Sequence, residues 1–148
     1  MKENYESLKL KNQLCFPLYA ASREITRKYT PMLKKLDLTY TQYIVMMVMW
    51  ENKKLTVGDL GRQLYLDTGT LSPLLKAMEE KGLLTRTRQK GDERVVHIEI
   101  TEKGENLKEE AAKVPEQMGK CIKLSPEEAK CLYGILYKIL DDTNSNSD

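Results

Sequence analysis

The feature that most restricts the fold of this chain is a pair of short helix signals in residues 56–81, separated by a tight turn. Residues 56–59 read Thr-Val-Gly-Asp, a pattern close to a capping box, which predicts a helix through Leu64. Residues 65–69 supply the turn, and a second helix is expected over residues 70–81. The second of two helices joined in this way is the one that can enter the major groove of DNA.

The end of the second helix and the segment behind it extend this pattern. Pro73 is expected in the first turn, where a missing N–H is tolerated, and Gly82 is expected as the C′ residue that ends the helix. Strands are expected over residues 83–88 and 95–100, joined by a charged turn over residues 89–94. Two short helices followed directly by a basic hairpin predict a winged helix-turn-helix domain.

Helix signals also precede this region. Residues 8–28 carry apolar side chains at helical spacing and predict one long helix, with Pro17 as an internal defect. The Thr-Pro pair at residues 30–31 is expected to break that helix. Thr41 is then expected to cap an apolar helix through Trp50, which we interpret as the central buried helix.

Two more helices are expected after the hairpin. Thr101 is expected to cap the first, and residues 125–128 (Ser-Pro-Glu-Glu) open the last with an N-cap serine, a proline at N1 and a glutamate at N3. The polar ends, residues 1–6 and 141–148, are expected to be loose tails. The predicted fold class is therefore mainly α with a small β-hairpin, a winged helix-turn-helix domain with additional N- and C-terminal helices.

Composition narrows the function classes. The chain has 148 residues, about one domain, and its formal net charge of +2 neither requires nor excludes a nucleic-acid partner. Its first residues lack an apolar signal region, no run is long enough to span a membrane, and its three cysteines are too widely spaced for a disulfide framework. We therefore expect a cytoplasmic protein without a membrane partner. His97 is the single histidine, and there is no glycine-rich phosphate loop, so we expect no metal, no cofactor and no enzyme.

Candidate DNA-binding residues lie at the start of the second helix and in the hairpin. Short hydroxyls can donate to bases or phosphates, a glycine lets the backbone approach closely, and an arginine at the wing tip suits a narrow minor groove. The candidates are Thr68, Gly69, Thr70, Ser72, Lys76, Arg86, Arg88 and Arg94. The alternative is a solvated amphipathic helix beside a charged hairpin, and the concentration of arginines directly behind the second helix argues against it.

These residues carry a resemblance to a known family. Residues 55–104 resemble the MarR family of repressors, most specifically in the wing motif Asp92-x-Arg94 and the later Thr101-x-x-Gly104. Residues 10–43 resemble the OhrR branch, whose members respond to organic hydroperoxides. The resemblance implies that Asp92 supports the wing and that the chain forms a homodimer on double-stranded DNA with an inverted-repeat operator.

The resemblance also implies a division of the single domain, residues 1–148. About 8–36 and 103–141 would be dimerisation helices, about 41–101 the winged helix-turn-helix DNA-binding region, and 142–148 a polar tail.

Cys15 is the candidate redox sensor. A cysteine on an amphipathic helix is most often inert packing, and a reactive one needs thiolate character, which hydrogen-bond donors such as phenols favour. Tyr19 lies four residues away on the same helix face. Tyr29 lies 14 residues away, about 21 Å along a continuous helix, so it could reach only the Cys15 of an antiparallel partner chain. The resemblance implies that Tyr29 and Tyr40 bond the sensing cysteine of the opposite subunit.

The expected mechanism is oxidation of Cys15 by an organic hydroperoxide to a sulfenic acid, which condenses with a second thiol and releases the operator. The surrounding pocket is expected to be apolar, with candidates Leu14, Phe16, Leu18, Met46 and Met47. The second thiol is either a small cellular thiol or Cys121, at the end of the penultimate helix; Cys131 is expected to be a packing residue. The alternative function is a MarR-like repressor released by a small aromatic ligand.

Overall fold

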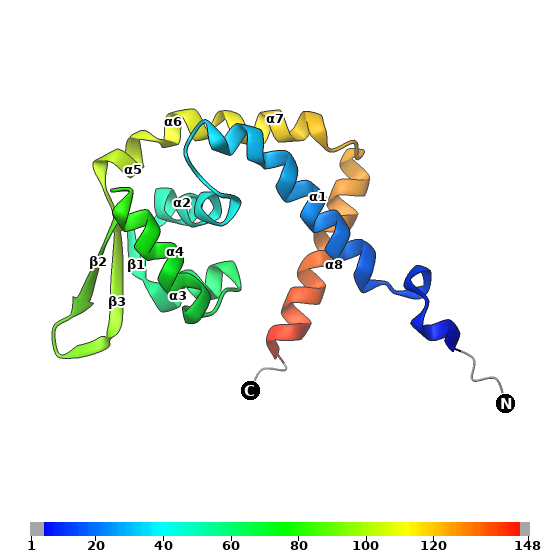
Figure 1. Ribbon diagram of the computed structural model, residues 1–148, viewed down its shortest axis with the longest axis horizontal. Coiled ribbons are helices and arrows are strands. Elements are labelled where there is room, and N and C mark those ends of the chain that lie inside the picture. The colour runs from blue at the N-terminus through cyan, green and yellow to red at the C-terminus, as the bar shows by residue number, and fades with distance from the viewer. Residues whose placement is uncertain (1–4, 146–148) are drawn as a thin grey trace. The chain divides into compact units, whose positions relative to one another are not determined.

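The computed structural model describes residues 5–145 and forms two compact units, one up to Pro115 and one from Glu116 (Figure 1). Its elements are η1 (Tyr5–Leu8), η2 (Leu10–Asn12), α1 (Cys15–Lys34), α2 (Tyr40–Asn52), β1 (Lys54–Thr56), α3 (Val57–Leu64), α4 (Thr68–Glu80), β2 (Leu84–Gln89), β3 (Asp92–Ile100), α5 (Glu102–Asn106), α6 (Lys108–Ala111), α7 (Lys113–Cys121) and α8 (Pro126–Ser145). Helices with a small antiparallel sheet confirm the predicted fold class.

The first long helix begins later and ends later than expected. α1 starts at Cys15, which places Pro17 in its first turn. The N–H groups of the first turn have no partner inside a helix, so a proline there costs no hydrogen bond, and the expected internal defect at Pro17 is wrong. The expected break at Thr30-Pro31 is also wrong, because Pro31 lies within α1, which continues to Lys34.

α2 is the central buried helix, as predicted, with Val45, Met46 and Met49 fully buried. Its N-cap is Thr39 and not Thr41. The Thr39 hydroxyl accepts from the Gln42 backbone N–H at 3.3 Å, and the Gln42 side chain accepts from the Thr39 backbone N–H at 3.1 Å. This reciprocal capping box fixes the start of the helix two residues earlier than expected.

The helix-turn-helix is formed by α3 and α4. Thr56 caps α3 as predicted, with its hydroxyl accepting from the Asp59 backbone N–H at 3.1 Å. α4 starts at Thr68 with Asp67 as N-cap, so Pro73 falls in its second turn and the expected first-turn position is wrong. Gly82 has the positive φ of +74° that the predicted C′ glycine requires.

The sheet has three strands in the order β1-β3-β2, all antiparallel. β2 and β3 form the predicted hairpin, longer than expected because pairing continues to Gln89 and Asp92 and leaves only Lys90 and Gly91 in the turn. β1 pairs Thr56 with His97 and was not predicted. The hairpin extends away from α2, α3 and α4 (Figure 1).

Helices and sheet of the first unit share one core. α4 contributes Leu71, Leu75 and Met78, and the sheet contributes Leu84 and Ile98, all almost completely buried. Because the core fixes α4 and the root of the hairpin together, the two elements predicted to meet DNA are held by the same packed interior.

The helices after the sheet start at the predicted caps. The Thr101 hydroxyl accepts from the Gly104 backbone N–H at 3.1 Å, and the single helix expected there is three successive segments, α5, α6 and α7. The Ser125 hydroxyl accepts from the Glu128 backbone N–H at 3.1 Å and so caps α8 as predicted. α8 runs to Ser145, so residues 142–145 are helical and not part of a tail, and residues 146–148 lie outside the described residues.

The expected N-terminal tail is likewise only partly described. Residues 1–4 lie outside the described residues, and Tyr5 and Glu6 belong to the 3-10 helix η1. Within the described part of the chain, no helix is long and apolar enough to cross a membrane.

Candidate DNA interface and cysteine site

The first two turns of α4 expose the residues predicted to read DNA. The Asp67 carboxylate accepts from the Thr70 backbone N–H at 2.8 Å and the Thr70 hydroxyl at 3.1 Å, and these bonds lower the pKa of Asp67. The Ser72 hydroxyl donates to the Thr68 carbonyl oxygen at 2.9 Å. Both hydroxyl protons are used within the helix, so the oxygen lone pairs remain as acceptors for DNA groups. The exposed candidates of α4 are Thr68, Gly69, Thr70, Ser72 and Lys76.

The tip of the wing is organised by Asp92. Its carboxylate accepts from the Arg94 backbone N–H and from Arg94 Nε, each at 3.1 Å. The Arg94 side chain is nevertheless 91% exposed, so its guanidinium keeps donors directed at solvent. Arg88 Nη1 donates to the Glu93 carbonyl oxygen at 2.7 Å, across the hairpin. Two arginines are thus held at the wing by partners within the hairpin itself.

Arg86 has a different environment from the other predicted DNA-binding arginines. Glu79 of α4 accepts from the Arg86 backbone N–H at 2.9 Å, from Nε at 3.0 Å and from Nη2 at 2.9 Å. These hydrogen bonds, with the charge of the guanidinium, hold the pKa of Glu79 below its ordinary value. Arg86 therefore ties β2 to α4, the second helix of the helix-turn-helix, which we call the recognition helix, and this internal partner was not predicted.

A groove of about 310 Å³ brings these elements together. Its walls come from the start of α3, the exposed side of α4, and the hairpin. Five of the eight predicted DNA-binding residues line it: Thr68, Ser72, Arg86, Arg88 and Arg94. Gly69, Thr70 and Lys76 lie on α4 outside the groove.

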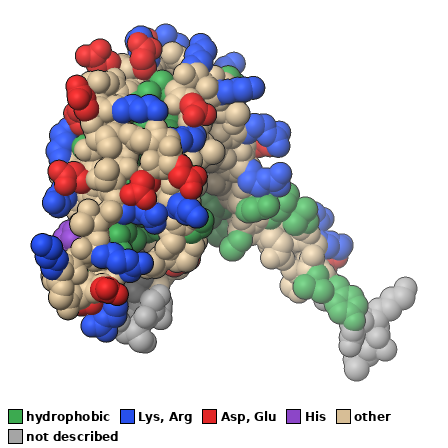
Figure 2. Space-filling view, turned by 60° about the vertical axis from the view of Figure 1, so that its left-hand side comes forward, with side chains coloured by type: hydrophobic (Ala, Val, Ile, Leu, Met, Phe, Trp, Pro, Cys, Tyr) green, Lys and Arg blue, Asp and Glu red, His purple; other side chains and the backbone are tan. Residues whose placement is uncertain are grey.

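Charge is mixed on the face of the molecule that includes the hairpin. Figure 2 shows lysine and arginine side chains interspersed with acidic ones over this face, and no uniformly basic patch. The same view shows hydrophobic side chains exposed along the arm that leads to the grey N-terminal residues. That arm is the N-terminal half of α1 and the turns before it, where Leu14, Phe16 and Leu18 are exposed.

Cys15 is the first residue of α1 and is exposed. Tyr19, one turn further on, is 60% exposed, and its ring lies 5.4 Å from the Arg23 guanidinium carbon in a cation–π contact. The unbroken helix from Cys15 to Tyr29 spans about 21 Å, so these two residues of one chain do not meet.

Tyr29 and Tyr40 do meet each other, on α1 and at the start of α2. Their ring centroids are 4.9 Å apart, and Tyr43 joins them at 5.9 Å from Tyr29 and 6.5 Å from Tyr40. Burial raises the pKa of all three phenols, and their mutual repulsion raises the pKa of Tyr29 and Tyr43 further. The phenols therefore stay protonated and able to donate at neutral pH. Tyr43 was not predicted, although its spacing of three from Tyr40 on one helix was a signal for it.

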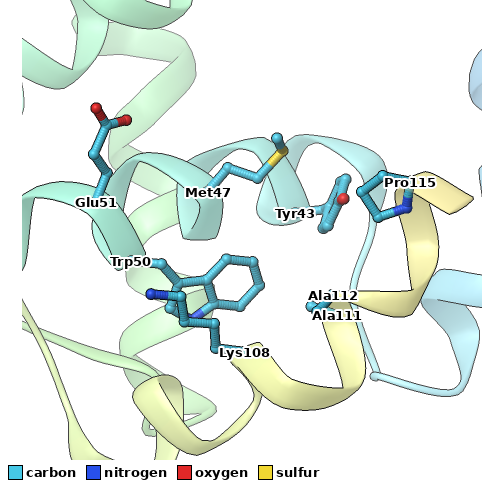
Figure 3. A pocket seen from close by; sticks show the side chains of 8 residues that line it. All are labelled: Tyr43, Met47, Trp50, Glu51, Lys108, Ala111, Ala112 and Pro115. Carbon is cyan, nitrogen blue, oxygen red and sulfur yellow. The ribbon is translucent and has the colours of Figure 1, made fainter.

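The apolar residues expected around Cys15 are not gathered in one place within this chain. Met46 is fully buried in the core, whereas Leu14 is 85% exposed. Met47 lines a different pocket, of about 420 Å³, between α2 and the segment of α6 and α7 up to Pro115. Tyr43 and Trp50 form its aromatic wall, as Figure 3 shows.

The two later cysteines are both exposed. Cys121 is the last residue of α7, the position expected from the sequence. Cys131 lies in the second turn of α8, and its exposure means that the expected packing role is not met within this chain. Among the described residues, no group of histidine, cysteine and acidic side chains could hold a metal ion.

A helix-turn-helix with an adjoining arginine-bearing hairpin is the architecture of the winged helix class of DNA-binding proteins. Residues 27–111 match the family model described as transcriptional regulator SarA/Rot. The organic hydroperoxide resistance transcriptional regulator of Bacillus subtilis is 49% identical over 141 residues, covering 95% of this chain and 96% of the relative. The chain belongs to the MarR family of transcriptional regulators, in its OhrR-like branch.

Solved structures of AbfR, from Staphylococcus epidermidis, are similar throughout the chain. Reduced AbfR bound to DNA has a TM-score of 0.77 and 33% identity and covers 94% of this chain and 96% of that one. A disulfide-formed AbfR has a TM-score of 0.65 and 33% identity, with coverages of 92% and 96%. The relatives are regulators, which confirms the expectation that this chain is not an enzyme.

Proposed function

We propose that this chain is a homodimeric repressor that binds an inverted-repeat operator and releases it when an organic hydroperoxide oxidises Cys15. The observation that carries the proposal is the separation of Cys15 from the Tyr29–Tyr40 pair along one unbroken helix. The cysteine is exposed and the tyrosines are clustered about 21 Å away, so donors from that cluster can reach a Cys15 only in a second copy. The repressor would act in the cytoplasm, where its operator lies.

The apolar surface of α1 supports a second copy as the partner. Leu14, Phe16 and Leu18 flank Cys15 and are between 43% and 85% exposed, which is unusual for large apolar side chains that have no partner. On α8, Leu132, Ile135 and Ile139 form a second exposed apolar stripe. A dimer through these faces would set the spacing of two recognition helices on two half-sites.

The proposed chemistry uses the Cys15 thiolate, the hydroperoxide, a proton and a second thiol. The Cys15 thiolate attacks the terminal peroxide oxygen, the O–O bond breaks, and an alcohol leaves once its oxygen takes up a proton. The product is a sulfenic acid. A second thiol then attacks the sulfenic sulfur, a disulfide forms, and water leaves. Before oxidation, the protonated phenols of the partner chain would donate hydrogen bonds to the Cys15 thiolate. After oxidation, the thiolate would no longer be present as their acceptor.

Cys121 is the proposed second thiol. It is exposed at the end of α7, directly before residues 122–125 that separate α7 from α8. A helix end can unwind locally to bring two Cα atoms within the roughly 7 Å that a disulfide requires. The solved relative AbfR has been described in a disulfide form. A small cellular thiol is the alternative partner for Cys15.

A second candidate function rests on the pocket in Figure 3. Tyr43, Met47 and Trp50 give it a mainly apolar wall, and one acidic and one basic side chain, Glu51 and Lys108, also line it, so a small aromatic ligand would fit its chemistry. In this case the repressor would be released by a ligand and not by oxidation.

One titration separates the two functions. The operator complex is titrated with cumene hydroperoxide and, separately, with a phenolic acid, each with and without dithiothreitol. Release by the peroxide that the reductant reverses supports the thiol mechanism. Release by the phenolic acid, independent of reductant, supports the ligand mechanism and contradicts the first.

A further inference from the structure

The end of the recognition helix is bonded to the corner between α1 and α2. Lys81 is the C-cap residue of α4, and its ammonium donates to the Asp37 carbonyl oxygen at 2.5 Å and to Gln42 Oε1 at 3.2 Å. It also lies 3.3 Å from Asp37 Oδ2, and its side chain is only 30% exposed. A single side chain therefore spans from α4 to the corner that precedes Tyr40.

Gln42 is the buried partner of Lys81 in this contact. It is 5% exposed, and its side-chain oxygen accepts from the Thr39 backbone N–H as well as from Lys81. The same buried Gln42 oxygen therefore accepts a hydrogen bond from the N-cap residue of α2 and another from the C-cap residue of α4. Because this oxygen is buried and both donors converge on it, we expect the start of α2 and the end of α4 to move together.

The corner itself contains a residue with an uncommon backbone conformation. Asp37 has a φ of +53°, in the left-handed region that is costly for a residue with a Cβ. On the other side, the Lys81 carbonyl oxygen accepts from Lys103 Nζ of α5 at 2.6 Å. Lys81 therefore joins the α1–α2 corner, the recognition helix and α5.

We propose that Lys81 is the positioning residue that transmits oxidation at Cys15 to the recognition helix. The inference rests on the proposed function. When the sulfur of the partner copy is oxidised, Tyr40 loses its acceptor and the first turn of α2 shifts. Gln42 lies two residues further along the same turn and carries the Lys81 ammonium, and with it the end of α4.

The test compares Lys81→Met with wild type and with the control Lys35→Met. Methionine keeps most of the length of the side chain and removes its donors, and Lys35 is an exposed lysine at the C-cap of α1 in the same corner. Three quantities are measured for each protein: operator affinity when reduced, the rate of Cys15 oxidation by cumene hydroperoxide followed by mass spectrometry, and operator affinity when oxidised.

Coupling through Lys81 predicts a specific pattern. Wild type and Lys35→Met should lose about tenfold or more in operator affinity on oxidation, the size of a typical allosteric coupling. Lys81→Met should bind the operator when reduced and oxidise at the wild-type rate, yet keep its affinity within about threefold when oxidised. Lys81→Arg, which restores a cationic donor, should regain most of the response.

Two results overturn the proposal. If oxidised Lys81→Met releases the operator as wild type does, the coupling does not pass through Lys81. If wild type and Lys35→Met both fail to respond to the peroxide, the proposed redox function itself has failed, and this outcome is distinct from a loss of response in Lys81→Met alone. Should Lys81→Met fail to fold by circular dichroism, Gln42→Met replaces it. Methionine keeps most of the length of the side chain and removes the oxygen that accepts from Lys81, so an undiminished response in that variant also contradicts the proposal.

Discussion

Gly104 determines how closely α5 can approach the sheet. A Cβ at this position would lie 2.3 Å from the Leu83 carbonyl oxygen and 2.9 Å from Ile100 Cγ1. The Gly104 carbonyl oxygen also accepts from Trp50 Nε1 at 2.9 Å, which fixes the indole of α2. The glycine of the Thr101-x-x-Gly104 motif is therefore required by the backbone contact, and the motif marks the junction of sheet, α2 and α5.

Gly104→Ala is expected to destabilise the protein by about 2 kcal/mol or more, because neither Leu83 nor Ile100 can yield without moving the sheet. Urea unfolding measures the loss. Gly58→Ala in α3 is the matched control, since its Cβ would meet nothing closer than 3.8 Å, and it should be neutral or up to about 1 kcal/mol more stable. Equal stability of the two variants would contradict the packing argument.

Arg94→Ala is expected to weaken operator binding without changing the fold, since the side chain is 91% exposed at the wing tip. The plot of log affinity against log salt should become shallower by about one unit if a single phosphate contact is lost. Binding isotherms at several salt concentrations measure this slope. An unchanged affinity at every concentration would remove Arg94 from the DNA site.

The sequence located three helix caps from local patterns, misplaced the cap of α2 by two residues, and missed contacts between elements. The caps at Thr56, Thr101 and Ser125 were predictable because capping depends on residues three apart. The contact of Lys81 with Gln42 joins residues 39 positions apart and had no local signal.

At the scale of elements, the carboxylate of Glu79 connects the wing to the recognition helix through hydrogen bonds. Glu79 receives three hydrogen bonds from Arg86, which align β2 with α4. The hairpin was predictable because apolar and polar residues alternate along its second strand. β1 has only three residues, which is too short for such an alternation to be recognised. The start of α1 was misjudged because a proline is tolerated in the first turn of a helix, where Pro17 lies. The end was misjudged because Pro31 lies within the helix without ending it.

The lowered pKa of Glu79 predicts a wing that loosens in acid. A carboxylate whose pKa is lower in the folded state stabilises that state above its ordinary pKa, and the contribution is lost as pH falls through the lowered value. A ¹³C carboxyl titration by NMR should give Glu79 a midpoint below the usual range for glutamate. In Arg86→Met the midpoint should return toward that range, and identical midpoints in the two proteins would contradict the assignment of the shift to Arg86.

At the scale of the whole molecule, the proposed switch requires two copies. Each chain would supply one cysteine and one tyrosine cluster, and the exposed apolar residues of α1 and α8 would be covered in the dimer. Oxidation would then alter an interface shared by both chains, and the spacing of the two recognition helices would change with it.

The proposed covalent form of this change is an intersubunit disulfide between Cys15 and Cys121. Peroxide-treated protein should run as a covalent dimer in non-reducing electrophoresis, and Cys121→Ser should abolish that dimer because its hydroxyl cannot form a disulfide. Cys131→Ser is the matched control and should leave the dimer intact. A covalent dimer that persists in Cys121→Ser would rule out Cys121 as the second thiol.

The central claim is that the sulfur of Cys15 is the sensor, and operator release by Cys15→Ser tests it most directly. Serine nearly matches cysteine in size, and residue 15 is exposed, so the variant should fold and bind the operator like wild type. Fluorescence anisotropy of a labelled operator is followed while cumene hydroperoxide is added. Wild type should release the operator and Cys15→Ser should retain it at every peroxide concentration, because a hydroxyl cannot be oxidised in this way. Release by Cys15→Ser at the wild-type concentration would contradict the account.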